Sequence, residues 1–268
     1  MPAKRLTTKS IEKPWGRAKL WPSFEPFETG EPIGEIWFQD ESDAGSELLV
    51  KYLFTGEKLS VQVHPDDAQA QARGFPRGKD EAWLILAADP DSTIALGPKL
   101  PVSPGELRSA AEDGSIVDLL DWRPVKAGDF IYSPAGTIHA IGAGLTLIEI
   151  QQNLDLTYRL YDYGRPRELH LEEGAAVSRL VPFAPPPSPE AANLLAEGPK
   201  FVVERLDAGE VSRQLGTVGA VLVTVAGHGT LDGLEFSAGE CWQLSGDCAI
   251  SAASGADLLL AYPGHQRI

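Results

Sequence analysis

A nine-residue stretch, LSVQVHPDD at residues 59–67, constrains the fold of this chain more than any other. Ser60, Gln62 and His64 are spaced two apart, so on an extended strand all three side chains point to one face and the valines between them point to the other. Pro65 ends the strand directly after His64. A strand face that carries an imidazole and an amide can supply two ligands to one metal ion. The same pattern also fits a half-exposed surface strand, so this stretch alone leaves both interpretations open.

The frequency of turn residues also favours a β fold. The chain of 268 residues contains 27 glycines and 21 prolines, a content typical of many short strands rather than long helices. Hydrophobic residues make up 43% of the sequence, which is enough for a core. The length is compatible with one large domain or two of ordinary size.

Charge and cysteine content argue against several classes of partner. The formal net charge of −15 disfavours nucleic acid and anionic membranes as partners. Basic residues within a pocket would therefore indicate an anionic substrate, which needs local positive charge to bind such an acidic protein. The two cysteines, Cys241 and Cys248, form no disulfide framework and suit a reducing compartment. We recognise no signal peptide and no membrane span, and therefore expect a cytoplasmic protein.

Helices are few in the predicted organisation. Residues 103–122 form the best helical stretch, with Ser103 as N-cap before a proline and Gly114 dividing it into two helices. This stretch interrupts the strands as an insertion. Residues 182–189, with five prolines, are the predicted linker, and residues 188–197 are predicted to form a short helix after it.

The second half of the chain repeats part of the first. The turn AGDF at residues 127–130 has a counterpart in AGEC at residues 238–241, 111 residues later. The same offset places Ile250 where His139 stands. We therefore predict two β-rich units in tandem, of which only the first carries a site.

His139 is the second histidine in a β setting, and it ends the pattern Gly-x5-Pro-x-Gly-x2-His that begins at residue 128. This pattern resembles the second sequence signature of cupins, in which a Pro-Gly turn delivers a histidine into the mouth of a β-barrel. The first cupin signature supplies a His-x-His pair with a nearby acid. Here Gln62 replaces the first histidine, and the acid, Glu81, lies farther along the chain.

Four blocks in order resemble the type I mannose-6-phosphate isomerases, a family of the cupin superfamily. The blocks are EKLSVQVHPDD at 57–67, GKDE at 78–81, PAGTIHA at 134–140, and EIQQN through YRLYDYGR at 149–165. The chain departs from the family pattern at Leu154 and Leu156, where short members usually carry a serine and a threonine. Beyond about residue 185 the resemblance is only to a second, degenerate β-barrel.

The resemblance implies an all-β fold of two tandem cupin-type (jelly-roll) β-barrels with a small helical insertion, the second barrel degenerate. Residues 1–183 would form the metal-binding catalytic domain, with the insertion near 103–122. Residues 184–268 would form the C-terminal degenerate cupin-like domain.

The resemblance also implies one Zn²⁺ per chain, held by Gln62, His64, Glu81 and His139. The residue types agree with this, because one carboxylate, two imidazoles and a neutral amide leave the ion partly uncompensated and with an open position, as a catalytic zinc requires. The implied reaction interconverts mannose 6-phosphate and fructose 6-phosphate. A proton moves between C2 and C1 through a cis-enediol, and zinc polarises the oxygen on which charge develops.

Three matched residues would carry catalysis. Glu149 would be the base, since partly apolar surroundings on its side of the strand would raise its pKa; a structural salt bridge is the alternative. Antiparallel pairing with the preceding strand, which carries His139, would bring the Glu149 carboxylate near the metal. Arg159 would hold the substrate oxygens or the enediolate, and Lys79 would be a further catalytic or substrate-binding group.

Three others would bind the substrate. Ser60 and Lys51 match family positions that bind the phosphate end, and Trp15 matches the aromatic residue that lines the pocket. A lysine in an apolar run such as residues 48–54 more often extends to a strand edge, and a single tryptophan is more often part of the core.

Two rival functions share the predicted fold. A cupin dioxygenase would use iron and molecular oxygen, but it usually needs the His-x-His pair that Gln62 breaks and has no use for Lys51, Lys79 and Arg159 around one site. A non-catalytic sugar-binding cupin would need the pocket but neither Glu149 nor the metal. We expect a monomer or a weak homo-oligomer. The sequence leaves open whether the enzyme serves mannose catabolism or GDP-mannose synthesis.

Overall fold

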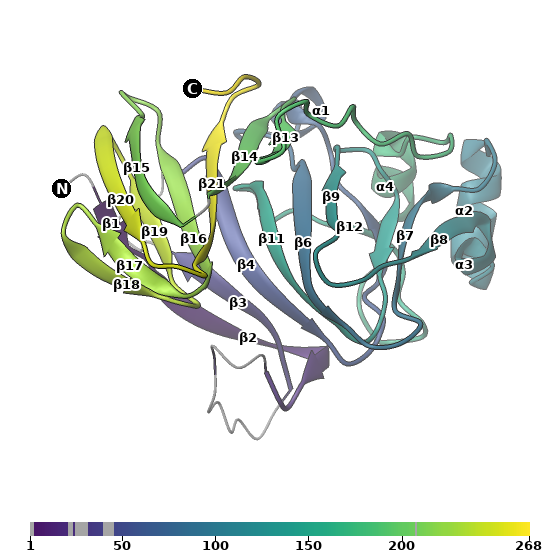
Figure 1. The fold of residues 1–268 in the computed structure, drawn as a ribbon. Coiled ribbons are helices and arrows are strands. Elements are labelled where there is room, and N and C mark those ends of the chain that lie inside the picture. Colours follow the sequence, from purple (N-terminus) through teal and green to yellow (C-terminus); the bar gives the residue numbers. More distant parts are fainter. Residues whose placement is uncertain (1–2, 21–23, 25–31, 40–45, 207) are drawn as a thin grey trace.

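The protein is built mainly of antiparallel strands (Figure 1). The computed structural model describes residues 3–20, 24, 32–39, 46–206 and 208–268. No helix in these ranges is long and apolar enough to cross a membrane.

Two sheets pack against each other in the first part of the chain. Sheet 1 has the strand order β2 (Thr7–Arg17), β3 (Ile33–Gln39), β4 (Leu48–Thr55), β11 (Leu145–Gln152), β6 (Glu81–Ala88) and β9 (Phe130–Ser133). Sheet 2 has the order β12 (Tyr158–Tyr161), β5 (Val61–Val63), β10 (His139–Ile141), β7 (Thr93–Pro98) and β8 (Leu120–Pro124). Leu53 and Trp83 of sheet 1 meet Leu96 and Ile141 of sheet 2 in one buried apolar cluster, which joins the two sheets at one end.

Two further sheets contain mainly the C-terminal strands. Sheet 3 has the order β1 (Ala3–Arg5), β19 (Cys241–Leu244), β16 (Ala220–Ala226), β21 (Asp257–Pro263), β14 (Phe201–Leu206) and β13 (Leu194–Glu197). Sheet 4 has the order β15 (Gly209–Gln214), β20 (Asp247–Ala252), β17 (His228–Leu231) and β18 (Leu234–Ser237). The N-terminal strand β1 pairs with β19, so the first described strand lies in a sheet of C-terminal strands. The division at residue 184 stays a prediction.

Sheets 1 and 3 share a hydrophobic core. Tyr52 and Ile148 of sheet 1 belong to the same buried cluster as Phe201, Val203 and Leu259 of sheet 3. Burial of this much apolar surface between the sheets stabilises both of them. The two parts of the chain are therefore expected to unfold together.

The described part of the chain contains the helices α1 (Asp67–Gln71), α2 (Pro104–Asp113), α3 (Ile116–Leu119) and α4 (Leu171–Val177). The predicted insertion is confirmed: Ser103 and Glu106 form a capping box at the start of α2, and Gly114, with φ of +84°, ends it. Residues 120–122 of the predicted helical stretch instead begin β8, because Leu120 is buried and pairs with Pro98 of β7. Helices α2 and α4 cover the face of sheet 2 to which the valines of β5 point.

The helix predicted over residues 188–197 is wrong. Its last residues form β13, in which Leu194 and Ala196 are buried and alternate with more exposed neighbours. Pairing with β14 at the edge of sheet 3 overrides the local helix propensity of alanine and leucine. The predicted linker, residues 182–189, lies outside helices and strands.

The internal repeat predicted from the sequence stays a prediction, and two features of the structure agree with it. Gly128 and Gly239 adopt φ of +90° and +82° and precede the equivalent strands β9 and β19. Ile250, at the position that corresponds to His139, is fully buried in the apolar core between sheets 3 and 4. The second copy thus has a hydrophobic side chain where the first has a histidine.

Phe201→Ala tests the shared core. Phe201 is fully buried and its ring centroid lies 5.0 Å from that of Tyr132 in sheet 1. We expect a loss of about 3–5 kcal/mol in unfolding free energy, with a single calorimetric transition at lower temperature. The exposed Phe75→Ala is the control. Two separate transitions, or equal effects of both variants, would contradict a shared core.

Candidate active site

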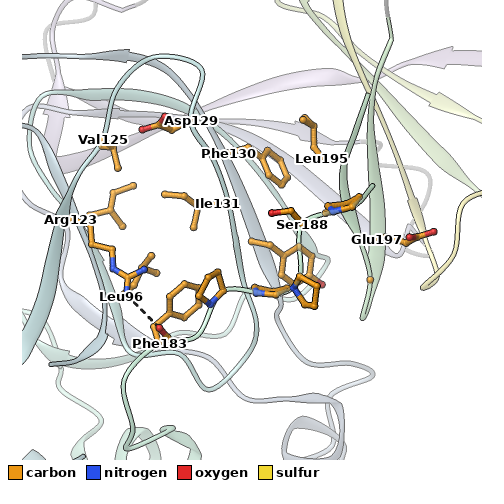
Figure 2. Close-up of a pocket in the computed structure, with 18 of the residues that line it drawn as sticks. Leu96, Arg123, Val125, Asp129, Phe130, Ile131, Phe183, Ser188, Leu195 and Glu197 are labelled. Atoms are coloured by element: carbon orange, nitrogen blue, oxygen red, sulfur yellow. Dashed lines mark hydrogen bonds between the residues drawn. The ribbon is translucent and has the colours of Figure 1, made fainter. Parts of the chain in front are cut away.

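Two cavities differ sharply in their chemistry. The larger, of about 840 Å³, lies between sheet strands and the proline-rich segment, and Phe130, Ile131 and Leu195 are among the apolar side chains around it (Figure 2). Arg123 at its edge already bonds to the Phe183 carbonyl, at 3.4 Å. The smaller cavity, of about 310 Å³, lies between sheets 1 and 2 and is lined largely by ionisable and polar groups. The smaller cavity is therefore the candidate active site.

All ten residues predicted for the site converge on this smaller cavity. Eight line it directly: Trp15, Lys51, Ser60, Gln62, Lys79, Glu81, Glu149 and Arg159. The other two, His64 and His139, are buried in its wall and contact Glu81. Their functional roles stay predictions.

Sheets 1 and 2 bring the predicted metal ligands together. His139 on β10 is the register partner of Gln62 on β5, and His64 follows β5 directly. Glu81, the first residue of β6, reaches across from sheet 1, with Oε1 3.2 Å from His64 Nε2 and Oε2 3.4 Å from His139 Nε2. Ligand atoms of the two histidines and Glu81 all lie within 4.8 Å of one another, so they can hold one metal ion.

Backbone hydrogen bonds fix the tautomer of both histidines. Nδ1 of His64 lies 3.0 Å from the Leu156 carbonyl, and Nδ1 of His139 lies 2.9 Å from the Thr137 carbonyl. Because a carbonyl oxygen only accepts, each Nδ1 donates its proton and each Nε2 is unprotonated, with its lone pair on the side of Glu81. Nε2 of His64 and Oε2 of Glu81 are buried without a hydrogen-bond partner in the described part of the chain. Acceptors that converge in this way suit a bound cation.

The protonation of these groups also suits a metal. Burial lowers the pKa of His64 to about 3 and lowers that of His139, so both imidazoles are neutral. Burial alone would raise the pKa of Glu81, but the Lys79 ammonium 3.0 Å away holds it well below its usual range. All three groups are therefore in the form that a metal binds.

The amide of Gln62 completes the cluster. Its Nε2 lies 3.2 Å from His139 Nε2, and its Oε1 lies 3.3 Å from the Ser60 hydroxyl. A half-turn of the terminal amide exchanges the oxygen and nitrogen and points the oxygen, a possible ligand, to the centre.

A buried carboxylate that the sequence prediction missed locks the ligand segments together. Asp80 accepts hydrogen bonds from the Ala135 amide at 2.9 Å and the Tyr132 hydroxyl at 2.8 Å, while its own amide donates to the Gln152 side chain at 3.0 Å. Asp80 thus ties the start of β6 to the turn that carries His139. The only hint in the sequence was its place in the GKDE block.

Four residues on neighbouring strands of sheet 1 form a row across the cavity. Trp37, Lys51, Glu149 and Trp83 are successive register partners on β3, β4, β11 and β6. Lys51 Nζ lies 3.2 Å from Glu149 Oε1, and Trp83 Nε1 donates to Glu149 Oε2 at 3.1 Å. Lys51 lies on an inner strand and faces the cavity, rather than extending to a sheet edge.

The strand pairing predicted for Glu149 is wrong. Its strand β11 pairs with β4 and β6, whereas the preceding strand β10, which carries His139, lies in sheet 2. Glu149 therefore lies in the same sheet as Glu81 and in the sheet opposite His139. The predicted rise in its pKa is confirmed: burial and the charge of Glu81 raise it, and Lys51 opposes them only in part.

The pKa shifts predict how the metal-free protein responds to acid. A histidine whose folded pKa is lowered destabilises the fold below its unfolded pKa of about 6.5, because only the unfolded chain then binds the proton. With His64 and His139 both lowered, we expect unfolding free energy to fall by about 2–3 kcal/mol between about pH 7.5 and 5.5. Denaturant titration in chelator measures it. The double variant His64→Gln, His139→Gln should flatten the dependence, and an equally steep curve would contradict this account.

Comparison with known proteins gives one consistent group of relatives. No protein-family model matches the chain. The chain is 41% identical over 160 residues to a mannose-6-phosphate isomerase of Streptococcus mutans, a match that covers 55% of this chain and 50% of the relative. The chain thus spans about half the length of the curated relatives it matches.

Solved structures extend the similarity over the whole chain. The crystal structure of the mannose 6-phosphate isomerase from Bacillus subtilis superposes with a TM-score of 0.82 at 26% identity, covering 97% of this chain and 99% of that one. A mannose 6-phosphate isomerase structure with bound zinc and yttrium superposes with a TM-score of 0.68 at 16% identity, covering 98% and 100%, and shows the fold alone. The predicted all-β, cupin-type fold is confirmed.

Proposed function

We propose that this chain, a relative of the mannose-6-phosphate isomerases with their cupin-type fold, interconverts mannose 6-phosphate and fructose 6-phosphate. One observation carries the proposal: a buried Lys51–Glu149 pair lines the cavity together with Glu81, whose carboxylate forms a buried cluster with His64 and His139. The cluster can hold a Lewis-acidic metal and the pair supplies a carboxylate able to move a proton. Aldose–ketose isomerisation uses such a base, and a Lewis acid can polarise the oxygen on which charge develops.

The metal proposed for this cavity is one Zn²⁺ per chain. His64, Glu81 and His139 would hold it through the lone pairs and carboxylate that face one another, with the Gln62 amide oxygen as a neutral fourth ligand. When bound, zinc supplies a positive charge that polarises a substrate oxygen without changing oxidation state. Lys79, 3.0 Å from Glu81 in this structure, would be released in part to contact the substrate.

The proposed proton transfer centres on Glu149. Its carboxylate takes the proton from C2 of mannose 6-phosphate and leaves a cis-enediolate with its charge on O1. The O2 hydroxyl proton passes to O1, and the protonated Glu149 returns a proton to C1 to give the ketose. Lys51 and Trp83 hold one carboxylate oxygen each, so the group is fixed in orientation. Arg159, on β12 opposite Gln62, offers its guanidinium donors to the substrate oxygens on which charge develops.

The proposed substrate contacts come from Trp15 and Ser60, which line the cavity, whereas Lys51, predicted at the phosphate end, contacts Glu149 and is proposed to act on the base. Lys13 and Arg167 add cationic groups whose side chains are more exposed. A cluster of cationic groups in a chain of net charge −15 favours an anionic ligand such as a sugar phosphate. The expected monomeric or weakly associated state and cytoplasmic location stay predictions.

Metal removal and return test the function directly. We expect chelation to abolish formation of fructose 6-phosphate in a coupled assay, and one equivalent of zinc to restore it. The unfolding temperature should fall only modestly, because the protein has a large apolar core of its own. Full activity in a metal-free preparation would contradict the proposal. Oxygen consumption with bound iron would instead indicate a dioxygenase, and sugar binding without turnover a binding protein.

Glu149→Gln tests the base. The amide keeps the shape and an acceptor but cannot take a proton, so we expect kcat to fall by about 10²–10⁴-fold with zinc content unchanged. Glu204→Gln is the control, since Glu204 is a fully buried, ion-paired carboxylate in sheet 3. Retained activity would place the base elsewhere, and loss of zinc would make Glu149 a ligand or its support.

A further inference from the structure

Glu35 is a buried carboxylate of the cavity that has no role in the proposed proton transfer. It lies on β3 with 8% of its surface exposed. Trp37, two residues along the same strand, donates its indole N–H to Glu35 Oε2, and the Lys13 ammonium lies 3.1 Å from Oε1. A carboxylate is costly to bury, so its presence beside the reacting groups calls for a partner there.

Lys51 is a second cationic partner of Glu35, beside Lys13. Its Nζ lies 3.9 Å from Glu35 Oε2 and 3.2 Å from Glu149 Oε1, and it stands 4.4 Å from the centre of the Trp37 ring. An ammonium group has three donors and no acceptor, so one cation is shared between two carboxylates and an aromatic face. Lys51 is almost fully buried, and water therefore does little to weaken this competition.

We propose that Glu35 is a positioning residue for the isomerase reaction: its negative charge draws the Lys51 ammonium partly away from Glu149. The charge of the Glu149 carboxylate is then incompletely neutralised, and this carboxylate can accept a proton. The inference rests on the proposed function. Without the charge of Glu35, Lys51 would turn fully to Glu149 and form a tighter charge-assisted hydrogen bond, which would make Glu149 a weaker base.

The charges of the neighbouring groups agree with a Lys51 ammonium that is shared between Glu35 and Glu149. The ionisable groups that face the cavity are Lys13, Glu35, Lys51, Lys79, Glu81, Glu149, Asp155, Arg159 and Arg167. Burial alone would raise the pKa of Glu35, but Lys51 and Lys13 lower it, so Glu35 stays ionised at neutral pH. Burial alone would lower the pKa of Lys51, but Glu149 and Glu35 raise it, so Lys51 stays an ammonium.

A crystal structure of the zinc-loaded Glu35→Gln variant tests the positioning without any substrate. We expect Lys51 Nζ to move away from residue 35 and to approach Glu149 to about 2.8 Å, the usual length of a charge-assisted bond. The zinc-loaded Glu204→Gln variant should leave Lys51 in place. A Lys51 ammonium that keeps its position in Glu35→Gln would overturn the inference.

A double-mutant cycle then tests the effect on the reaction. We expect Glu35→Gln to lower kcat about tenfold, with KM within about twofold, and Glu35→Asp to restore part of kcat. Because Glu35 acts through Lys51, Glu35→Gln should have no further effect on kcat in a Lys51→Met background. Independent, multiplicative effects would overturn the inference. If wild-type protein has no isomerase activity, the proposed function fails, and the crystal structure alone then decides whether Glu35 positions Lys51.

Discussion

The candidate site depends on one electrostatic constraint: Glu81 is a buried carboxylate that faces the lone pairs of two neutral imidazoles. Lone pairs and negative charge that converge away from water are unfavourable unless positive charge joins them. Lys79 supplies part of that charge in this structure, and a divalent metal would supply it fully. The arrangement of acceptors thus selects a cation and defines where a substrate oxygen can be polarised.

The fold offsets the cost of burying these groups by assembling the site between two well-packed sheets. Sheet 2 contributes Gln62, His64 and His139, while sheet 1 contributes Glu81 and Glu149. The apolar cluster between sheets 1 and 2 packs them together, and helices α2 and α4 cover the outer face of sheet 2. The shared core with sheet 3 supports sheet 1 from its other side. Apolar packing therefore surrounds the ionisable groups on both sides.

Local patterns in the sequence predicted much of this arrangement. The Pro-Gly turn before His139 and the capped helix at Ser103 each depend on a few neighbouring residues, and both are confirmed. The strand predicted around Gln62 is confirmed over Val61–Val63, and His64 follows it directly. The sheet to which Glu149 belongs could not be predicted, because it depends on which distant strands pair with β11.

The same reason explains what sequence reasoning missed. Glu35 and Lys51 become neighbours only through the register of β3 with β4, and Asp80 only through its contact with Ala135 in a distant turn. Non-local pairing likewise turned the end of the predicted helix at residues 188–197 into a strand. Propensity acts over a few residues, whereas sheet order is set by the whole core.

The central claim is that this cavity moves a proton between adjacent carbons of a sugar phosphate. Isotope analysis of the reaction in deuterium oxide tests it most directly, with zinc-loaded full-length chain, mannose 6-phosphate and proton NMR of the fructose 6-phosphate formed. An enediol pathway with a carboxylate base exchanges its proton with solvent, so the account predicts deuterium at C1 of the product. Product that retains all of its original C2 hydrogen at C1, or no product at all, would contradict the account.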